Sequence, residues 1–126
     1  YLSQSFKFFR LARGECEDLF ALCAERGWSN VALIGVSDLG EIATLCAREF
    51  PVTLIGVADA GAGNDSHAGL PVYRDLTDMD GIDAVMVTDL LNPQGAFEEA
   101  CRTLPPDRVL APRFMRVSRQ GPRLEE

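Results

Sequence analysis

The spacing of hydrophobic positions predicts a long helix at the start of the chain. From Ser3 to about Arg26, apolar side chains recur every three or four residues, which is typical of an amphipathic helix. Gly27 follows, and glycine commonly ends helices. The predicted helix has about 24 residues and a length of roughly 36 Å at 1.5 Å per residue. The chain opens within this helix and not at a helix cap.

After Gly27 the pattern changes to short, continuous apolar runs at 30–36, 52–59 and 82–88. Runs without alternation predict parallel strands that are covered on both faces. A helix from about Leu39 to Glu49 joins the first two runs into a right-handed βαβ unit. Shorter elements complete the expected order: a mobile loop at 60–68, a strand at 69–73, helical turns at 75–81, a helix from Asn92 to about Leu104 and a last strand at 108–111.

This order predicts an α/β fold class, a three-layer Rossmann-like domain with a small parallel sheet, preceded by a long N-terminal helix. We assign residues 1–27 to a linker or dimerisation helix and residues 28–126 to the Rossmann-like domain. A chain of 126 residues is long enough for one core, but not for a cofactor domain and a separate substrate domain.

Charge and composition narrow the classes of partner and reaction. The net charge of -7 argues against this chain binding nucleic acid or anionic lipid by itself. The only lysine is Lys7, which leaves P-loop, Schiff-base and Tyr-Lys dehydrogenase chemistry without another lysine. Neither a signal peptide nor an apolar run near 18 residues is present, so we expect a cytoplasmic protein that does not contact a membrane.

The cysteines and the single histidine form no recognisable catalytic or metal-binding motif. No C-x-x-C is present, and His67 in the glycine-rich loop is expected to be solvated. The cysteines lie on apolar faces of predicted helices, so we expect buried thiols in a reducing compartment, with a redox-sensing thiol as the alternative. They are Cys16, Cys23, Cys46 and Cys101. We therefore expect no enzyme and no metal.

The turn after the first strand carries two glycines of a dinucleotide-binding G-x-G-x-x-G motif. Gly35 and Gly40 occupy its first and third glycine positions, and Ser37 replaces the second. The Ser37 hydroxyl can donate to a phosphate, but the Asp38 carboxylate competes with an anion at the helix N-terminus. Both interpretations stay open: the turn binds a phosphate, or it has only the shape of such a site.

Asp59 ends the second strand, 19 residues after Gly40. A carboxylate there can accept both hydroxyls of a ribose, which favours NAD over NADP, although Asp also commonly caps the start of a loop. Thr88 and Asp89 end the third strand at the same crevice. The predicted cofactor-binding set is Gly35, Ser37, Asp38, Leu39, Gly40, Asp59, Thr88 and Asp89. The cofactors it suggests are NAD(H) or a nucleotide-sugar.

Three aromatic residues in the first helical turns, Phe6, Phe8 and Phe9, are expected to lie beyond the reach of this domain. Exposed aromatics of this kind usually mark a partner surface. We expect a homodimer through this helix, an upstream domain, or both.

The chain also resembles the C-terminal part of bacterial winged helix-turn-helix regulators. The resemblance rests on the aromatic- and Arg-rich helix, on the VAL-G-G-EIA and VAD patterns between Val31 and Asp59, on Gly69, Pro71 and Val72, and on the 83–88 strand. The turn is also similar to the N-terminal nucleotide-sugar-binding domain of sugar O-acyltransferases and, more distantly, to NADH-binding redox-sensing repressors. The resemblance to the regulators implies a regulatory domain that reaches DNA only through an upstream domain.

Three functions therefore compete. The first is a ligand-sensing or dimerisation domain of a transcriptional regulator that binds a nucleotide, dinucleotide or nucleotide-sugar. The alternatives are a minimal NAD-dependent oxidoreductase or epimerase fragment and a dimerisation module that binds no ligand.

Overall fold

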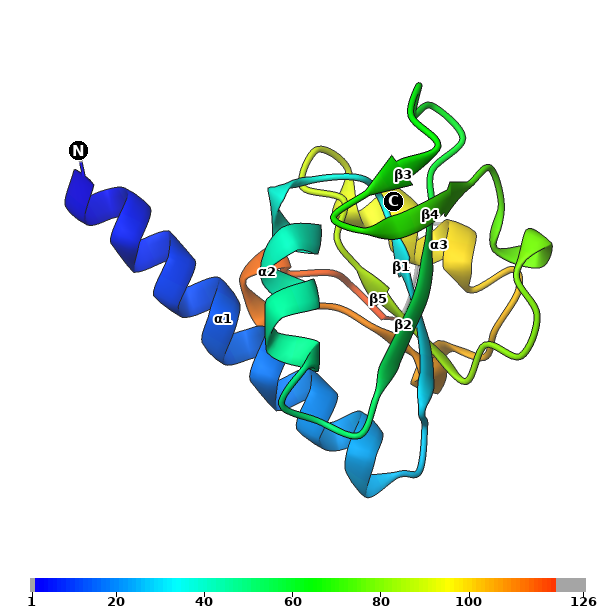
Figure 1. The fold of residues 1–126 in the computed structure, drawn as a ribbon, viewed down its shortest axis with the longest axis horizontal. Coiled ribbons are helices and arrows are strands. Elements are labelled where there is room, and N and C mark those ends of the chain that lie inside the picture. The colour runs from blue at the N-terminus through cyan, green and yellow to red at the C-terminus, as the bar shows by residue number, and fades with distance from the viewer. Residues whose placement is uncertain (1, 120–126) are drawn as a thin grey trace, which may run out of the picture.

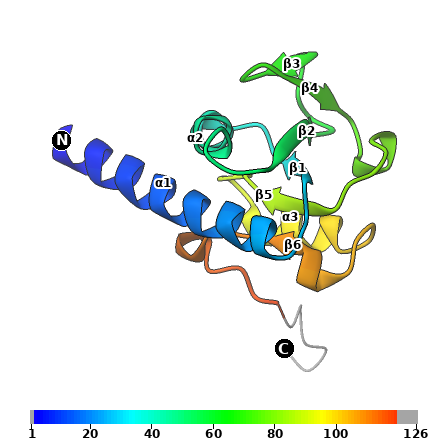
Figure 2. The same ribbon diagram turned by 60° about the horizontal axis from the view of Figure 1, so that its bottom comes forward.

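The computed structural model describes residues 2–119, with side chains from Phe6 onward. It shows one six-stranded sheet with helices on both faces (Figures 1 and 2). The helices are α1 (Leu2–Glu25), α2 (Asp38–Ala47) and α3 (Pro93–Ala100), with 3-10 turns η1 (Leu76–Asp78), η2 (Pro106–Arg108) and η3 (Arg113–Met115). The strands are β1 (Asn30–Ile34), β2 (Thr53–Ala58), β3 (Ser66–His67), β4 (Leu70–Tyr73), β5 (Ala84–Val87) and β6 (Val109–Leu110). The predicted α/β fold with a long first helix is confirmed.

The sheet has the order β3-β4-β2-β1-β5-β6, and every pairing except β3–β4 is parallel. Strand β1 lies between β2 and β5, so the chain leaves β1 toward one side of the sheet and later crosses to the other. This is a topological switch point, where the carboxyl ends of the strands leave a crevice in open parallel sheets. The predicted crevice therefore lies at the ends of β1 and β5.

Alternate residues of β1 face two separate hydrophobic cores. Val31 and Leu33 pack toward α1 and α2, whereas Ala32 and Ile34 pack toward α3. Because both faces are buried, the strands need apolar residues at every position, which explains their continuous apolar runs.

The C-terminal half of α1 belongs to the first core. Ala12, Cys16, Phe20 and Cys23 are fully buried there and recur at the spacing that the sequence predicted. Burial raises the pKa of Cys16 to about 12, so this thiol stays protonated and unreactive at neutral pH.

The N-terminal half of α1 extends past the sheet (Figure 1). Phe6 is 64% exposed, as expected from the sequence. The expectation that all three aromatics lack a partner in this chain is wrong for Phe8, whose ring meets Phe114 edge-on at 5.6 Å between centroids. This contact ties η3 to the N-terminal half of α1.

The structure corrects two boundaries. The segment at 60–68 was predicted as a loop, but Ser66 and His67 form β3 and pair with β4. Helix α3 ends at Ala100, four residues before the predicted end, and the residues after it form turns. Phe114, Met115 and Val117 pack against the cores as expected. No helix in residues 2–119 has the length and apolarity needed to span a membrane.

Candidate ligand cleft and the turn after β1

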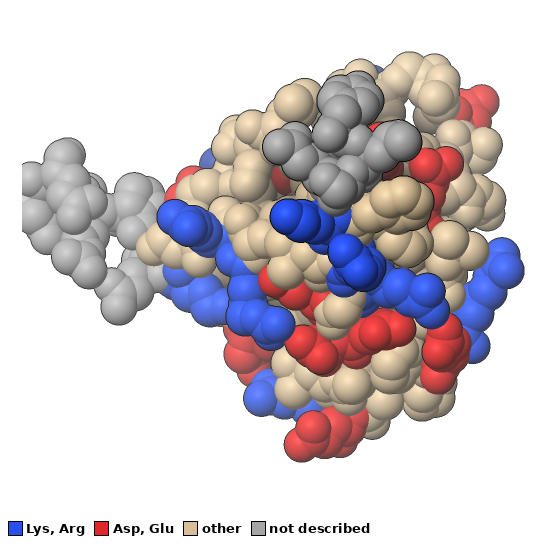
Figure 3. All heavy atoms as spheres, turned by 90° about the vertical axis from the view of Figure 1, so that its left-hand side faces the viewer, with Lys and Arg blue, Asp and Glu red and all other residues tan. Residues whose placement is uncertain are grey.

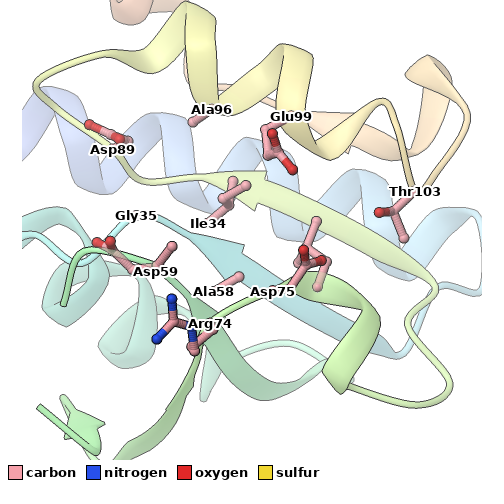
Figure 4. Close-up of a pocket in the computed structure, with 12 residues that line it drawn as sticks. Ile34, Gly35, Ala58, Asp59, Arg74, Asp75, Asp89, Ala96, Glu99 and Thr103 are labelled. Carbon is pink, nitrogen blue, oxygen red and sulfur yellow. The ribbon is translucent and has the colours of Figure 1, made fainter. Parts of the chain in front are cut away.

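A cleft of about 290 Å³ opens at the carboxyl ends of β1, β2 and β4, on the face of the sheet that α3 covers (Figure 4). Its walls come from the ends of four strands, β1, β2, β4 and β5, from η1 and from α3. They consist of Ile34, Gly35, Ala58, Asp59, Ala60, Arg74, Asp75, Leu76, Asp89, Ala96, Glu99 and Thr103. The cleft therefore lies beside the switch point, where the fold predicts a ligand.

Gly35 allows the ends of β1 and β5 to meet. Its φ of +103° lies in a region that side chains rarely adopt, and a Cβ at this position would lie only 2.4 Å from the Asp89 Cβ. The first glycine of the motif is therefore needed for a contact between two loops of the protein itself. The two loops leave no space between Gly35 and Asp89 at this point.

Two hydroxyl groups hold these loops together. The buried Thr88 Oγ1 donates to the Gly35 carbonyl at 2.6 Å, and the Ser37 hydroxyl donates to the Thr88 carbonyl. Ser37 is also the N-cap of α2, since its Oγ accepts from Leu39 N at 3.1 Å. The one proton of the Ser37 hydroxyl is thus already donated within the protein, so it is not free for a phosphate.

Several backbone amides of the turn also have acceptors within the chain. Val36 N donates to Asp59 Oδ2 at 2.8 Å, and Gly40 N donates to the Ser37 carbonyl at 3.0 Å. Asp38 occupies the first turn of α2 with an exposed carboxylate, where its charge is favourable to the helix dipole. A turn in which these amides and the Ser37 hydroxyl already donate within the chain, next to the Asp38 carboxylate, is a weaker site for a pyrophosphate than a turn with all its donors free.

His67 covers this turn, which the sequence did not predict. Its Nε2 lies 2.8 Å from the Ser37 carbonyl, so Nε2 carries the proton and donates. A Cβ on Gly40 would lie 3.3 Å from the imidazole ring, so the third glycine gives the room that His67 needs. The expectation that His67 is only solvated is wrong, and the expected loop at 60–68 holds a residue that docks on α2.

Asp59 presents a fixed carboxylate to the cleft. Oδ2 accepts from Val36 N, and Oδ1 accepts from Gly61 N at 3.0 Å. Two amides on opposite oxygens hold the orientation of the group, and each carboxylate oxygen can still accept a further hydrogen bond. Asp59 therefore caps its own loop and also lines the cleft, and its binding of ribose hydroxyls stays a prediction.

The other charged groups of the cleft differ in how far they are engaged. Asp75 caps η1, and Asp89 Oδ1 accepts from the amides of Leu91 and Asn92. Glu99 forms an exposed ion pair with Arg102 at 3.3 Å. Arg74 is the one basic residue among those that line the cleft, and Figure 4 shows its guanidinium extending toward Asp59. The cleft is therefore acidic on balance.

Of the predicted set, Gly35, Asp59 and Asp89 line the cleft. Ser37 and Thr88 form the hydrogen bonds that join the loops after β1 and β5. Leu39 is a buried core residue. Asp38 and Gly40 are not among the lining residues. Sequence reasoning missed Arg74, Asp75, Glu99 and Thr103, because only the tertiary fold brings η1 and α3 to the strand ends.

Within the described residues, no group of three or more His, Cys, Asp or Glu side chains is arranged to hold a metal ion. Comparisons of the chain with protein-family models, with curated proteins and with solved structures found no match. The resemblance to regulators and acyltransferases stays a prediction, and the function is argued from the geometry of the cleft.

Proposed function

We propose that this chain is a ligand-sensing domain whose cleft binds a ribonucleoside moiety. The observation that carries the proposal is the Asp59 carboxylate, held by two amides at the wall of a cleft beside the switch point. A carboxylate in that position accepts the two hydroxyls of a ribose. This is the role that the sequence predicted for Asp59.

The same geometry disfavours a pyrophosphate over the turn. Three groups that would bind it, the amides of Val36 and Gly40 and the Ser37 hydroxyl, already donate within the chain. The volume of about 290 Å³ lies at the lower end of the roughly 300–1,000 Å³ that is typical of ligand pockets. Both observations favour a nucleoside over a whole dinucleotide such as NAD(H), or over a nucleotide-sugar.

The enzyme alternative has less support from the cleft. Asp75 and Asp89 cap their own loops, which is a structural role. Binding and sensing need only an oriented acceptor such as Asp59. We propose that ligand binding changes the activity of a transcriptional regulator, in which a domain upstream of Tyr1 binds the DNA.

A thermal-shift series over nucleosides tests the cleft. We expect adenosine or another ribonucleoside to raise the melting temperature, and its 2′-deoxy form to raise it less, because the deoxy form has one hydroxyl fewer for Asp59. Asp59→Asn keeps the shape of the side chain and is expected to abolish the shift, whereas Glu41→Gln, an exposed change on α2, is expected to leave it unchanged. A series in which no ribonucleoside shifts the native protein would contradict the proposal.

We also propose that the chain forms a homodimer through the N-terminal half of α1. A groove of about 320 Å³ between α1 and α2 is lined in part by Phe9, Ile42 and Leu45, and Leu45 is 54% exposed. The charged Arg13, Arg48 and Glu49 also line the groove, and the exposed Phe6 lies outside it on the same helix. Exposed apolar side chains that gather in this way usually contact another protein. Association of two copies would cover them.

Light scattering tests the dimer. We expect a dimer at micromolar concentration for the native chain and a monomer for Phe6→Ser. Leu91→Ser is the matched control, because Leu91 is 99% exposed and lies after β5, outside the groove. A native chain that is monomeric at high micromolar concentration would rule out this second proposal.

A further inference from the structure

Arginines concentrate in the last described segment of this acidic protein. Between Arg108 and Arg119 the sequence holds four arginines and no Asp or Glu, although the whole chain has a net charge of -7. Figure 3 shows basic side chains gathered across the face that lies at the N-terminal end of α1. Acidic side chains lie directly beside them in the same view, so the segment from Arg108 to Arg119 is a local basic region and not part of a face of one sign.

The segment is fixed to the body at several points. Phe114 N donates to the Oε1 of the buried Glu15 at 2.9 Å. Ser118 exchanges two hydrogen bonds with the Gln94 side chain, at 2.7 and 3.0 Å. Met115 and Val117 pack against the cores. The arginines between these points therefore project from an ordered backbone.

Three of the arginines surround one hollow of about 260 Å³. Its lining consists of Ala111, Pro112, Arg113, Arg116, Val117 and Arg119. The spacing of three residues between the arginines follows η3 and the turn after it. This hollow is separate from the nucleoside cleft, since the two share no lining residue.

The three guanidinium groups differ in how they are held. Arg119 Nη1 donates to the carbonyls of Pro106 and Val109 at 2.9 and 2.8 Å, which fixes this group with its other N–H groups unused by these bonds. Arg113 pairs with Asp18 at 3.1 Å. In the part of the chain that the structure describes, Arg116 has no ion-pair partner. Two carboxylates contact this segment, Asp18 at Arg113 and Glu15 at Phe114 N, so three positive charges stand against two carboxylates.

The backbone at Arg116 carries strain that a plain turn would avoid. Its φ of +53° and ψ of +40° are left-handed, a conformation that non-glycine residues rarely adopt. Such strain costs on the order of 1–3 kcal/mol and clusters at functional sites. Glycine would relieve it, but glycine would remove the guanidinium from the hollow.

We propose that Arg113, Arg116 and Arg119 form a binding site for a phosphate group. Guanidinium groups bind phosphate oxygens in pairs of parallel hydrogen bonds, and three of them around one hollow match a dianionic group. The phosphate belongs either to a free phosphorylated compound or to a nucleic acid backbone. The site is independent of the nucleoside cleft, so either proposal can fail without the other.

Phosphate binding is tested by calorimetry with inorganic phosphate and pyrophosphate at low salt. Arg116→Gly is the main variant, because glycine accepts the left-handed backbone and the variant is expected to fold as well as the native chain. We expect its affinity for either anion to fall at least about tenfold. Arg102→Ala is the matched control, since it removes an exposed arginine outside the hollow, and we expect no change.

A short DNA duplex distinguishes the two sources of phosphate. Salt-sensitive duplex binding that Arg116→Gly weakens would identify a nucleic acid backbone, because phosphate contacts release counterions. Binding of the small anions alone would identify a free phosphorylated compound. The proposal is overturned if neither anion nor duplex binds the native chain, or if Arg116→Gly and Arg102→Ala bind equally well.

Discussion

The turn after β1 and the hollow at 111–119 contrast in how their donors are used. The turn has two glycines of a phosphate-binding motif, but its Ser37 hydroxyl and Val36 amide donate within the chain. The hollow has no motif, but three guanidinium groups line it, and the carboxylates of Asp18 and Glu15 bond to the same segment. The comparison teaches that a phosphate site depends on unused donors and local charge, and a glycine pattern guarantees neither.

The glycines of the turn serve the protein's own contacts. Gly35 admits Asp89, and Gly40 admits the His67 ring. Both contacts draw neighbouring segments onto the turn, so they fill space that a ligand would need. Asp59 remains the one motif residue that faces the cleft with acceptor capacity.

The largest effect is expected from a substitution that breaks the contact between the loops after β1 and β5. Gly35→Ala places a methyl group 2.4 Å from the Asp89 Cβ and forces alanine to a φ of +103°. We expect the free energy of unfolding to fall by roughly 3 kcal/mol or more, measured by urea denaturation. Gly14→Ala is the matched control, since a Cβ there meets nothing within 4 Å, and it is expected to stabilise α1 by about 1 kcal/mol. Equal effects at both glycines would contradict the close contact.

A smaller effect is expected from Ser37→Ala. The change removes the N-cap of α2 and the hydrogen bond to the Thr88 carbonyl, so we expect a loss of about 1–2 kcal/mol in the free energy of unfolding. If the turn were a phosphate site, phosphate binding would weaken as well. We expect the calorimetric affinity for phosphate to stay unchanged, and a clear fall would move the site back to the turn.

The smallest effect is expected from a substitution that tests how the charge of Asp38 influences anion binding at the turn. Asp38→Asn removes a carboxylate from the first turn of α2, which is expected to cost about 0.5 kcal/mol through the helix dipole. Because the Val36 and Gly40 amides and the Ser37 hydroxyl already have acceptors, we expect no gain in phosphate affinity. A gain in affinity that depends on Ser37 would show that only the charge of Asp38 had kept an anion from the turn.

The hydrophobic pattern was enough to predict every strand except β3, the three α-helices apart from the end of α3, and the position of Asp59, because burial on both faces demands unbroken apolar runs. It did not predict the contacts that decide the state of the turn. Ser37 meets Thr88 across 51 positions, and His67 meets Ser37 across 30. Neither pair has a local signature, and β3 lay in a polar, glycine-rich stretch with only two paired residues. The three arginines of the hollow are close together in the sequence, but the sequence does not show that contacts with α1 and α3 fix the backbone between them around a hollow.

The central claim is that Asp59 binds ribose hydroxyls in the cleft. The amides of Val36 and Gly61 report on it directly, since both donate to the Asp59 carboxylate. In a titration with adenosine followed by ¹H–¹⁵N NMR, we predict that these two amide signals shift with one saturation curve, and that Asp59→Asn abolishes the shifts. Saturable binding that leaves both amides unmoved, or that persists in Asp59→Asn, would contradict the account.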